Sequence, residues 1–298
     1  MLPGPLSAAL AYVLWGLAPL YLKQLADVPA LQVVAHRSWW ALLFVFALLA
    51  WRSRIGRVRR ALSERRTLAI FALSAALLST NWLIYVWAVS AGRIVDASLG
   101  YFINPLVNVL LGVAVLHERP RPLQWFAVAV AAGGVAALVA VAGEWPWIAL
   151  TLAGSFGVYG LLRKTAPLGA AEGLGLETLL QAPLALALIL WWAAQGSNAM
   201  RVDDPATSLW LIAAGPLTAV SLLLFAAGAR SVSLATLGLL QYLGPTLQFL
   251  IGVGVYGEPF GAGRALGFGL IWAALLIYSG EAAWRWRAGG VRPVQPRA

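Results

Sequence analysis

The sequence is a succession of long apolar runs. Ten runs of about twenty residues follow one another, with only short polar stretches between them. A helix needs about twenty apolar residues to cross the hydrocarbon core of a bilayer. Hydrophobic residues make up 61% of the 298-residue chain and charged residues 11%, whereas a soluble domain is about half apolar and about a quarter charged. The chain is therefore predicted to be an all-α integral membrane protein.

Proline, glycine and charged residues mark the ends of the apolar runs. They predict ten transmembrane helices at roughly 5–25, 30–51, 67–90, 94–117, 121–142, 145–164, 170–194, 207–229, 233–256 and 261–281. Because the intervening loops are short, we expect one compact helical bundle.

The basic residues predict the direction of these helices, because Lys and Arg collect on the cytoplasmic side of a membrane. If the ten helices alternate, 16 Lys and Arg residues fall on one side and 4 on the other. Seven of the 16 lie in the 52–66 loop and four in the tail 282–298. This asymmetry predicts that both termini are cytoplasmic.

The sequence lacks the motifs that are typical of several classes of function. The chain has no Cys and only two His, so we expect no disulfide and no metal site. It carries no Walker A pattern and no arrangement typical of a catalytic triad or a zinc protease. Its basic residues lie in short loops rather than on one soluble face, which argues against a nucleic-acid partner. We therefore predict that it is not an enzyme, needs no cofactor, and has the lipid bilayer as its surroundings.

The segment LGYFINPLVNVLLGVAVLHE (99–118) has a counterpart 140 residues later, LLQYLGPTLQFLIGVGVYGE (239–258). Pro105 aligns with Pro245, and eight identities occur over 81–118 without a gap. The shift moves the fourth predicted helix onto the ninth, so the two copies cross the membrane in opposite directions. Inverted repeats are typical of secondary transporters, whose substrate site lies near the midplane where the repeats meet.

The repeat also predicts the organisation of the chain. We expect a first five-helix repeat over 1–142, a second inverted one over 143–281, and a basic cytoplasmic tail over 282–298. The two repeats are predicted to surround a central cavity.

Polar residues occupy one face of both copies. Tyr101, Asn104 and Asn108 are spaced i, i+3 and i+7 and so share a helix face, and Gln241 and Gln248 lie at equivalent positions in the second copy. We predict that this face lines the cavity and binds substrate. The alternative is that the amides only hold neighbouring helices together.

The aligned prolines are the candidate hinges. Pro105 and Pro245 lack an N–H and disturb the bond to the carbonyl four residues earlier. Freed carbonyls inside a membrane are tolerated only against protein or a watery cavity. Both prolines are therefore predicted to open their helices toward the bundle interior.

Three further aromatic residues and one amide are substrate-binding candidates. Asn81 and Tyr85 are spaced i, i+4 in the third predicted helix, and Trp15 lies deep in the first. Tyr159 lies in GSFGVYG, inside the sixth predicted helix and without the context of a catalytic serine. Trp82 is expected on another face, packing or meeting lipid.

Charged residues inside membrane helices are costly and are functional candidates by default. Glu177, the deepest, is the candidate for proton coupling, and His36, Arg37 and Lys23 are candidates for coupling or gating. We favour a structural ion pair between Arg37 and Asp96.

Lys23 aligns with Arg163 under the same 140-residue shift. Such a pair is expected at opposite ends of a pathway, where it could flank the route of a carboxylate. Simple anchoring at the two membrane surfaces explains the pair equally well.

The motifs WGLAPLYLK, AHRSWW, NWLIYVWAV, SLGYFINPLVNVLLGVAVLHERPRPLQW and LRK together resemble the drug/metabolite transporter superfamily. The branch that they resemble is the EamA type, close to the RarD group of bacterial inner-membrane proteins. The resemblance implies ten helices in two inverted repeats, a central cavity, and export of amino acids or similar small metabolites without ATP.

The residues alone favour a small neutral or zwitterionic solute with an apolar part, because the cavity candidates are Tyr, Trp, Asn and Gln. The prediction is a multi-pass secondary transporter of the bacterial inner membrane that exports amino acids or similar metabolites by alternating access. An exporter of drugs, nucleosides or sugars, and a structural membrane protein that transports nothing, are the alternatives. Oligomeric state and ion coupling stay open.

Overall fold

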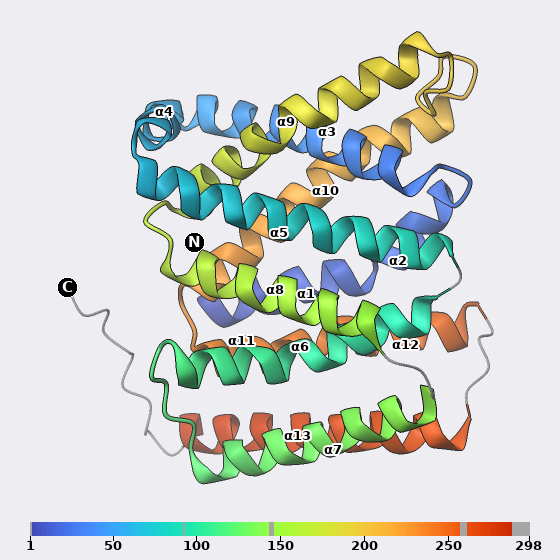
Figure 1. The fold of residues 1–298 in the computed structure, drawn as a ribbon. Helices are drawn as coiled ribbons and strands as arrows, with labels where there is room; N and C mark the ends of the chain where they lie inside the picture. Colours follow the sequence, from blue (N-terminus) through green and yellow to red (C-terminus); the bar gives the residue numbers. More distant parts are fainter. Residues whose placement is uncertain (1, 92, 143–145, 257–260, 288–298) are drawn as a thin grey trace. The chain divides into compact units, whose positions relative to one another are not determined.

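The protein, seen in a computed structural model, is described over residues 2–91, 93–142, 146–256 and 261–287, and all regular structure there is helical (Figure 1). The helices are α1 Gly4–Gly16, α2 Ala18–Leu22, the 3-10 helix η1 Lys23–Leu25, α3 Ala30–Trp51, α4 Ile55–Ser63, α5 Arg65–Ser90, α6 Ile94–Ala114, α7 Pro122–Ala142, α8 Trp147–Thr165, α9 Ala170–Ala194, α10 Pro205–Ala229, α11 Leu234–Gln241, α12 Leu243–Gly254 and α13 Ala262–Arg287.

Seven of these helical segments, among the residues described, are long and apolar enough to cross a membrane: Gly4–Leu25, Ala30–Trp51, Arg65–Val89, Ala97–Ala114, Pro122–Val141, Ala170–Ala194 and Pro205–Ala229. This confirms an all-helical, multi-pass membrane protein. The count of ten crossings and the cytoplasmic position of both termini stay predictions.

The helices form two compact units. The larger unit contains α1 to α6 and α8 to α12, and the smaller contains α7 and α13. In the larger unit α3 packs against α9 and α10, α1 packs against α10, and α6 packs against α8 and α11. Two aromatic-rich cores, one around Phe71 and Phe225 and the other around Tyr85 and Leu152, hold this unit together.

The smaller unit is a tight antiparallel pair of helices, which lie side by side in Figure 1. A Cβ atom on Gly134 would lie 2.8 Å from the carbonyl oxygen of Gly267, so the two backbones approach closely because neither residue has a side chain. Arg121, at the start of α7, pairs with Glu281 near the end of α13 at 3.5 Å.

The helix predicted over 233–256 is two helices, α11 and α12, separated at Tyr242. Pro245 is the third residue of α12, and its ring collides with the place that the carbonyl of Gln241 would take in a continuous helix. The aligned Pro105 lies inside α6, which stays unbroken. The two copies of the repeat therefore differ in whether the proline ends a helix.

The basic 52–66 stretch, expected as a loop, contains the short helix α4. Val58 and Ala61 are buried on one side of it. Arg54 and Arg57 reach from this region to the buried carboxylate of Glu172 on α9, with N–O distances of 3.1 and 3.3 Å. The local sequence alternates Arg with apolar residues at helical spacing, which is why this stretch folds against the bundle.

Candidate functional site

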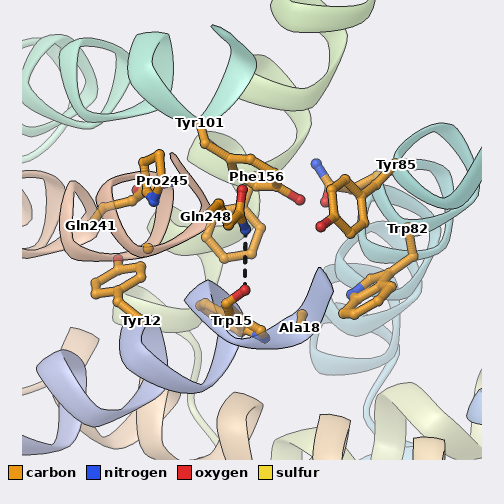
Figure 2. A pocket seen from close by; sticks show the side chains of 12 residues that line it. Tyr12, Trp15, Ala18, Trp82, Tyr85, Tyr101, Phe156, Gln241, Pro245 and Gln248 are labelled. Carbon is orange, nitrogen blue, oxygen red and sulfur yellow. Dashed lines mark hydrogen bonds between the residues drawn. The ribbon is translucent and has the colours of Figure 1, made fainter. Parts of the chain in front are cut away.

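A pocket opens inside the larger unit, between α1, α2, α5, α6, α8, α11 and α12 (Figure 2). Its empty space, including the open mouth, is about 480 Å³. The lining residues are Tyr12, Trp15, Ala18, Asn81, Trp82, Tyr85, Tyr101, Phe156, Gln241, Gly244, Pro245 and Gln248.

One wall of the pocket is made by a break in the first helix. Pro19, the second residue of α2, has no N–H to give to the carbonyl of Trp15, so α1 ends at Gly16. The side chain of Gln248 on α12 supplies the missing donor, its Nε2 lying 3.1 Å from the Trp15 oxygen (Figure 2). The two broken helices are thus joined to each other at the pocket.

Five rings, here called the aromatic layer, pack together beside the pocket: Tyr12, Trp15 and Phe156, which line it, and Tyr159 and Phe225, which do not. The Trp15 ring lies 5.4 Å from that of Phe156 and 5.5 Å from that of Phe225. Tyr159 stacks on Phe225 with 5.8 Å between centroids. Edge-to-face and tilted pairs of this kind add packing energy beyond their buried area, so the rings of the layer are expected to hold one another in place.

The amide groups that border the pocket are mostly engaged by the protein. Asn81 donates to the carbonyl of Leu152 and to the hydroxyl of Ser155, both at 3.0 Å. Gln241 accepts a hydrogen bond of 3.1 Å from Asn108. These side chains therefore shape the wall before any solute binds.

Two tyrosines are freer to meet a solute. The rings of Tyr85 and Tyr101 extend into the pocket, with 5.4 Å between their centroids (Figure 2). Neither hydroxyl bonds to another of the described residues. Both can donate or accept a hydrogen bond inside the pocket.

The structure brings most of the predicted substrate-binding residues to this pocket. Those in its lining are Trp15, Asn81, Tyr85, Tyr101, Gln241 and Gln248, together with the hinge candidate Pro245. Asn104, Asn108, Tyr159 and Pro105 are not in the lining. That any of these residues binds a solute stays a prediction.

Asn104 and Asn108 serve the alternative role of holding helices together. Asn104 donates to the carbonyl of Ala153 on α8 at 2.7 Å. Asn108 donates to Asn104 at 3.0 Å and to Gln241 on α11 at 3.1 Å. The polar face of α6 is thus divided: Tyr101 meets the pocket, whereas the two asparagines fasten α6 to α8 and α11.

Three aromatic residues of the lining were not predicted from the sequence. Trp82 was expected on another face but forms part of the wall, and Tyr12 and Phe156 were not considered. Tyr12 lies three residues before Trp15, and Trp82 three residues before Tyr85, so i, i+3 spacing from an accepted candidate was the signal that could have found both.

Glu177 lies outside the pocket lining, in a second polar cluster. Its carboxylate is fully buried, accepts a hydrogen bond from the hydroxyl of Ser74, and lies 3.6 Å from Arg163 Nη1. Arg163 also donates to the carbonyl of Ala170 at 3.0 Å, and the hydroxyl of Tyr159 faces Glu177. The cluster joins α5, α8 and α9.

Arg163 lies in the last turn of α8, as its predicted place at a helix end requires, but it is buried among other helices. Its side chain is 2% exposed and packs over the ring of Phe71 at 5.5 Å. Lys23, the aligned residue, is exposed and lies over the ring of Tyr256 at 5.1 Å. The two basic residues therefore have different surroundings despite their alignment.

The remaining charged candidates lie on α3. His36 Nε2 and Asn198 Oδ1 are 2.9 Å apart, which ties α3 to the loop before α10. Arg37 is buried, and its guanidinium lies 4.6 Å from the centre of the Trp82 ring. The side chain of Asp96, the expected partner of Arg37, lies outside the described residues. Within the part of the chain that is described, no group of three or more metal-ligating side chains occurs.

The fold and the site define a polytopic helical membrane protein that encloses an aromatic pocket between broken helices. The EamA-like transporter family matches residues 2–140. An uncharacterized transporter of Pseudomonas aeruginosa is 46% identical over 92% of both chains. The chain belongs to this family, within the drug/metabolite transporter superfamily, and is a multi-pass protein of the bacterial inner membrane.

Other relatives agree. Protein RarD of Salmonella typhi is 42% identical, over 95% of this chain and 97% of its own. The uncharacterized transporter YojE of Bacillus subtilis is 43% identical over 93% of each chain. A solved crystal structure of a protein with 19% identity covers 94% of this chain and 98% of its own with a TM-score of 0.68, which shows a shared fold.

The buried ion pair between Arg163 and Glu177 gives a stability prediction. Arg163→Met leaves the Glu177 carboxylate buried without its cation, so the free energy of unfolding should fall by about 3–5 kcal/mol. Replacing both residues, as Arg163→Met with Glu177→Leu, should recover much of that loss. Thermal unfolding of the purified protein in detergent measures both effects.

A matched control for this prediction is the exposed pair of Arg201 and Asp203, 2.6 Å apart. Arg201→Met should leave the melting temperature nearly unchanged, because exposed ion pairs contribute little to stability. If the Arg163→Met protein melts at the same temperature as the unaltered protein, the pair does not hold α8 and α9 together.

Proposed function

We propose that this protein is a secondary transporter that exports amino acids or similar small metabolites across the bacterial inner membrane by alternating access. The observation that carries the proposal is the pocket itself. Helices from both halves of the sequence line it, α1, α2, α5 and α6 from the first and α8, α11 and α12 from the second. A site at the meeting of two halves suits a transporter in which one half rocks against the other.

Contacts between equivalent helices support the inverted repeat. A shift of 140 residues carries α3 onto α9, α6 onto α11 and α12, and α7 onto α13, and each of these pairs is in contact. Phe102 and Tyr242, 140 residues apart, stack at 6.1 Å, and the Tyr242 hydroxyl donates to the Phe102 carbonyl at 3.3 Å. Equivalent positions meet in this way where a two-fold axis passes between repeats.

The same shift supports the count of ten crossings. It carries the α1 to η1 segment onto α8 and α5 onto α10, so each half contributes five crossing segments if α4 lies at the surface. An even number of crossings places both termini on one side of the membrane, which agrees with the distribution of Arg.

The lining favours a solute with an apolar body. Aromatic rings and amides surround the pocket, and none of its lining residues carries a formal charge. The preference for amino acids comes from the resemblance to exporters of the superfamily. Drugs, nucleosides and sugars are the other solute classes to test.

The first test is efflux from proteoliposomes preloaded with a mixed pool of radiolabelled amino acids. We expect saturable efflux that is stimulated by the same solute outside. External solute returns the binding site of a carrier to the inside, whereas a channel has no binding site that must return. Phe, Met and Thr are the first solutes to follow. Absence of efflux for every amino acid from correctly inserted protein contradicts amino-acid export and directs the search to the other solute classes.

The two prolines are the proposed hinges. Pro105→Ala and Pro245→Ala should each slow transport while leaving the folded protein intact, since alanine restores the N–H that the proline lacks. We expect the larger effect at Pro245, which lies at the break between α11 and α12. Counterflow rates and thermal unfolding are compared for both variants, and unchanged rates in both remove the hinge role.

Glu177 is the proposed coupling residue, if transport is proton-coupled. It is buried beside Arg163 and Tyr159, and Tyr159 belongs to the aromatic layer beside the pocket. Glu177→Gln keeps the shape of the side chain but cannot exchange a proton. Transport by this variant should lose the pH dependence of the unaltered protein; a retained pH dependence assigns the coupling to another group.

A further inference from the structure

Arg37 is a buried cation with little to bind. It is 3% exposed, in the second turn of the membrane-spanning helix α3. Its single hydrogen bond among the described residues is a long one, 3.4 Å from Nη2 to the hydroxyl of Ser38, and its Nε is buried without a partner. No carboxylate of the described residues lies within ion-pair distance of it. Arg163, equally buried, has Glu177 at 3.6 Å.

A buried charge of this kind lowers the stability of the folded protein. A charged side chain inside a membrane helix needs a partner, and an unpaired one marks a functional site by default. A guanidinium presents five N–H donors in a planar fork that fits a carboxylate. Most of the N–H donors of Arg37 make no hydrogen bond to the described residues.

The position of Arg37 connects it to the pocket. Its Cζ atom lies 4.6 Å from the centre of the Trp82 ring, and Trp82 is part of the pocket wall (Figure 2). Arg37 is therefore one side chain behind the wall, on the same side as Trp82.

Several groups at the pocket that can donate a hydrogen bond have no partner among the described residues. The hydroxyls of Tyr85 and Tyr101 bond to none of the described residues. Trp15 Nε1 and the hydroxyl of Tyr12 are buried without a hydrogen-bond partner in the described part of the chain. No Asp or Glu lines the pocket. A solute with acceptor oxygens is the complement of such a site.

We propose that Arg37 is the residue that makes the pocket select solutes carrying a carboxylate. The apolar body of the solute lies among the rings, and its carboxylate accepts hydrogen bonds from the Arg37 fork once Trp82 turns aside. Arg37 thereby gains a counter-charge that none of the described residues provides. This inference rests on the proposed transport function and assigns a specificity-determining residue to that same site.

The rival interpretation is structural. Arg37 could only hold Trp82 in place through its cation–π contact, which is a common arrangement for arginine. The two roles differ in what they do to selectivity. A structural residue affects all solutes alike, whereas a carboxylate-binding residue affects only those with a carboxylate.

The experiment compares L-phenylalanine with L-phenylalaninamide, which keeps the ring and the amino group but lacks the carboxylate. Calorimetric titration of the purified full-length protein in detergent gives both affinities. We expect the unaltered protein to bind the acid roughly tenfold or more tightly, as a charge-assisted hydrogen bond provides. Arg37→Gln should lose that preference, with the affinity for the amide changed by less than about twofold.

Two control variants sharpen the comparison. Arg201→Gln removes an exposed Arg outside the pocket and should leave both affinities unchanged. Arg37→Lys keeps the charge but not the fork, so it should retain part of the acid preference. If Arg37→Gln does not fold, the Lys variant carries the test, and an undiminished acid preference in it counts against the proposal.

Stability supplies an independent readout. Arg37→Gln should melt no lower than the unaltered protein, because it leaves no buried carboxylate unpaired, in contrast to Arg163→Met. The proposal is overturned if Arg37→Gln weakens acid and amide equally, or if the unaltered protein binds both alike. If either of these results occurs while the proteoliposomes still show amino-acid efflux, the transport function stands and only the role of Arg37 is removed.

Discussion

The structure depends on how a membrane protein satisfies backbone groups where no water is available. Breaks in helices are costly inside a bilayer unless other protein groups replace the lost hydrogen bonds. Here the chain breaks at Leu17 and at Tyr242, and the Gln248 side chain binds the carbonyl that the first break exposes. Both breaks lie beside the pocket, so the same feature that opens the helices also furnishes the wall of the site.

The polar residues of the membrane helices divide into two groups. Asn104, Asn108 and Glu177 bind other helices and fix their positions. The hydroxyls of Tyr85 and Tyr101 meet the pocket instead. The amides and the carboxylate are thus engaged by the protein, whereas the pocket is lined mainly by aromatic rings.

Much of the fold and part of the site could be predicted from the sequence. Apolar runs predicted the helices to within a few residues, as at Ala30–Trp51 and Ala170–Ala194, because burial in lipid imposes a length that the sequence records directly. Tyr85 and Gln248 were predicted because polar groups at helical spacing share one face, and Trp15 because it lies deep in the first predicted helix. The helix α4 was missed inside a stretch expected to be a loop. The prolines were predicted to open their helices, but the sequence did not indicate that the helix would end before Pro245 while α6 continues through Pro105.

By itself the sequence determined a polytopic helical membrane protein with a weak internal repeat, because hydrophobicity, proline positions and spacing are local properties. Only the tertiary structure decided which side chains share a partner. Gln248 meets the carbonyl of Trp15 across 233 positions of the chain, and Arg37 meets Trp82 on another helix. A face of a helix can be read from spacing, but the group that it faces depends on how the helices pack.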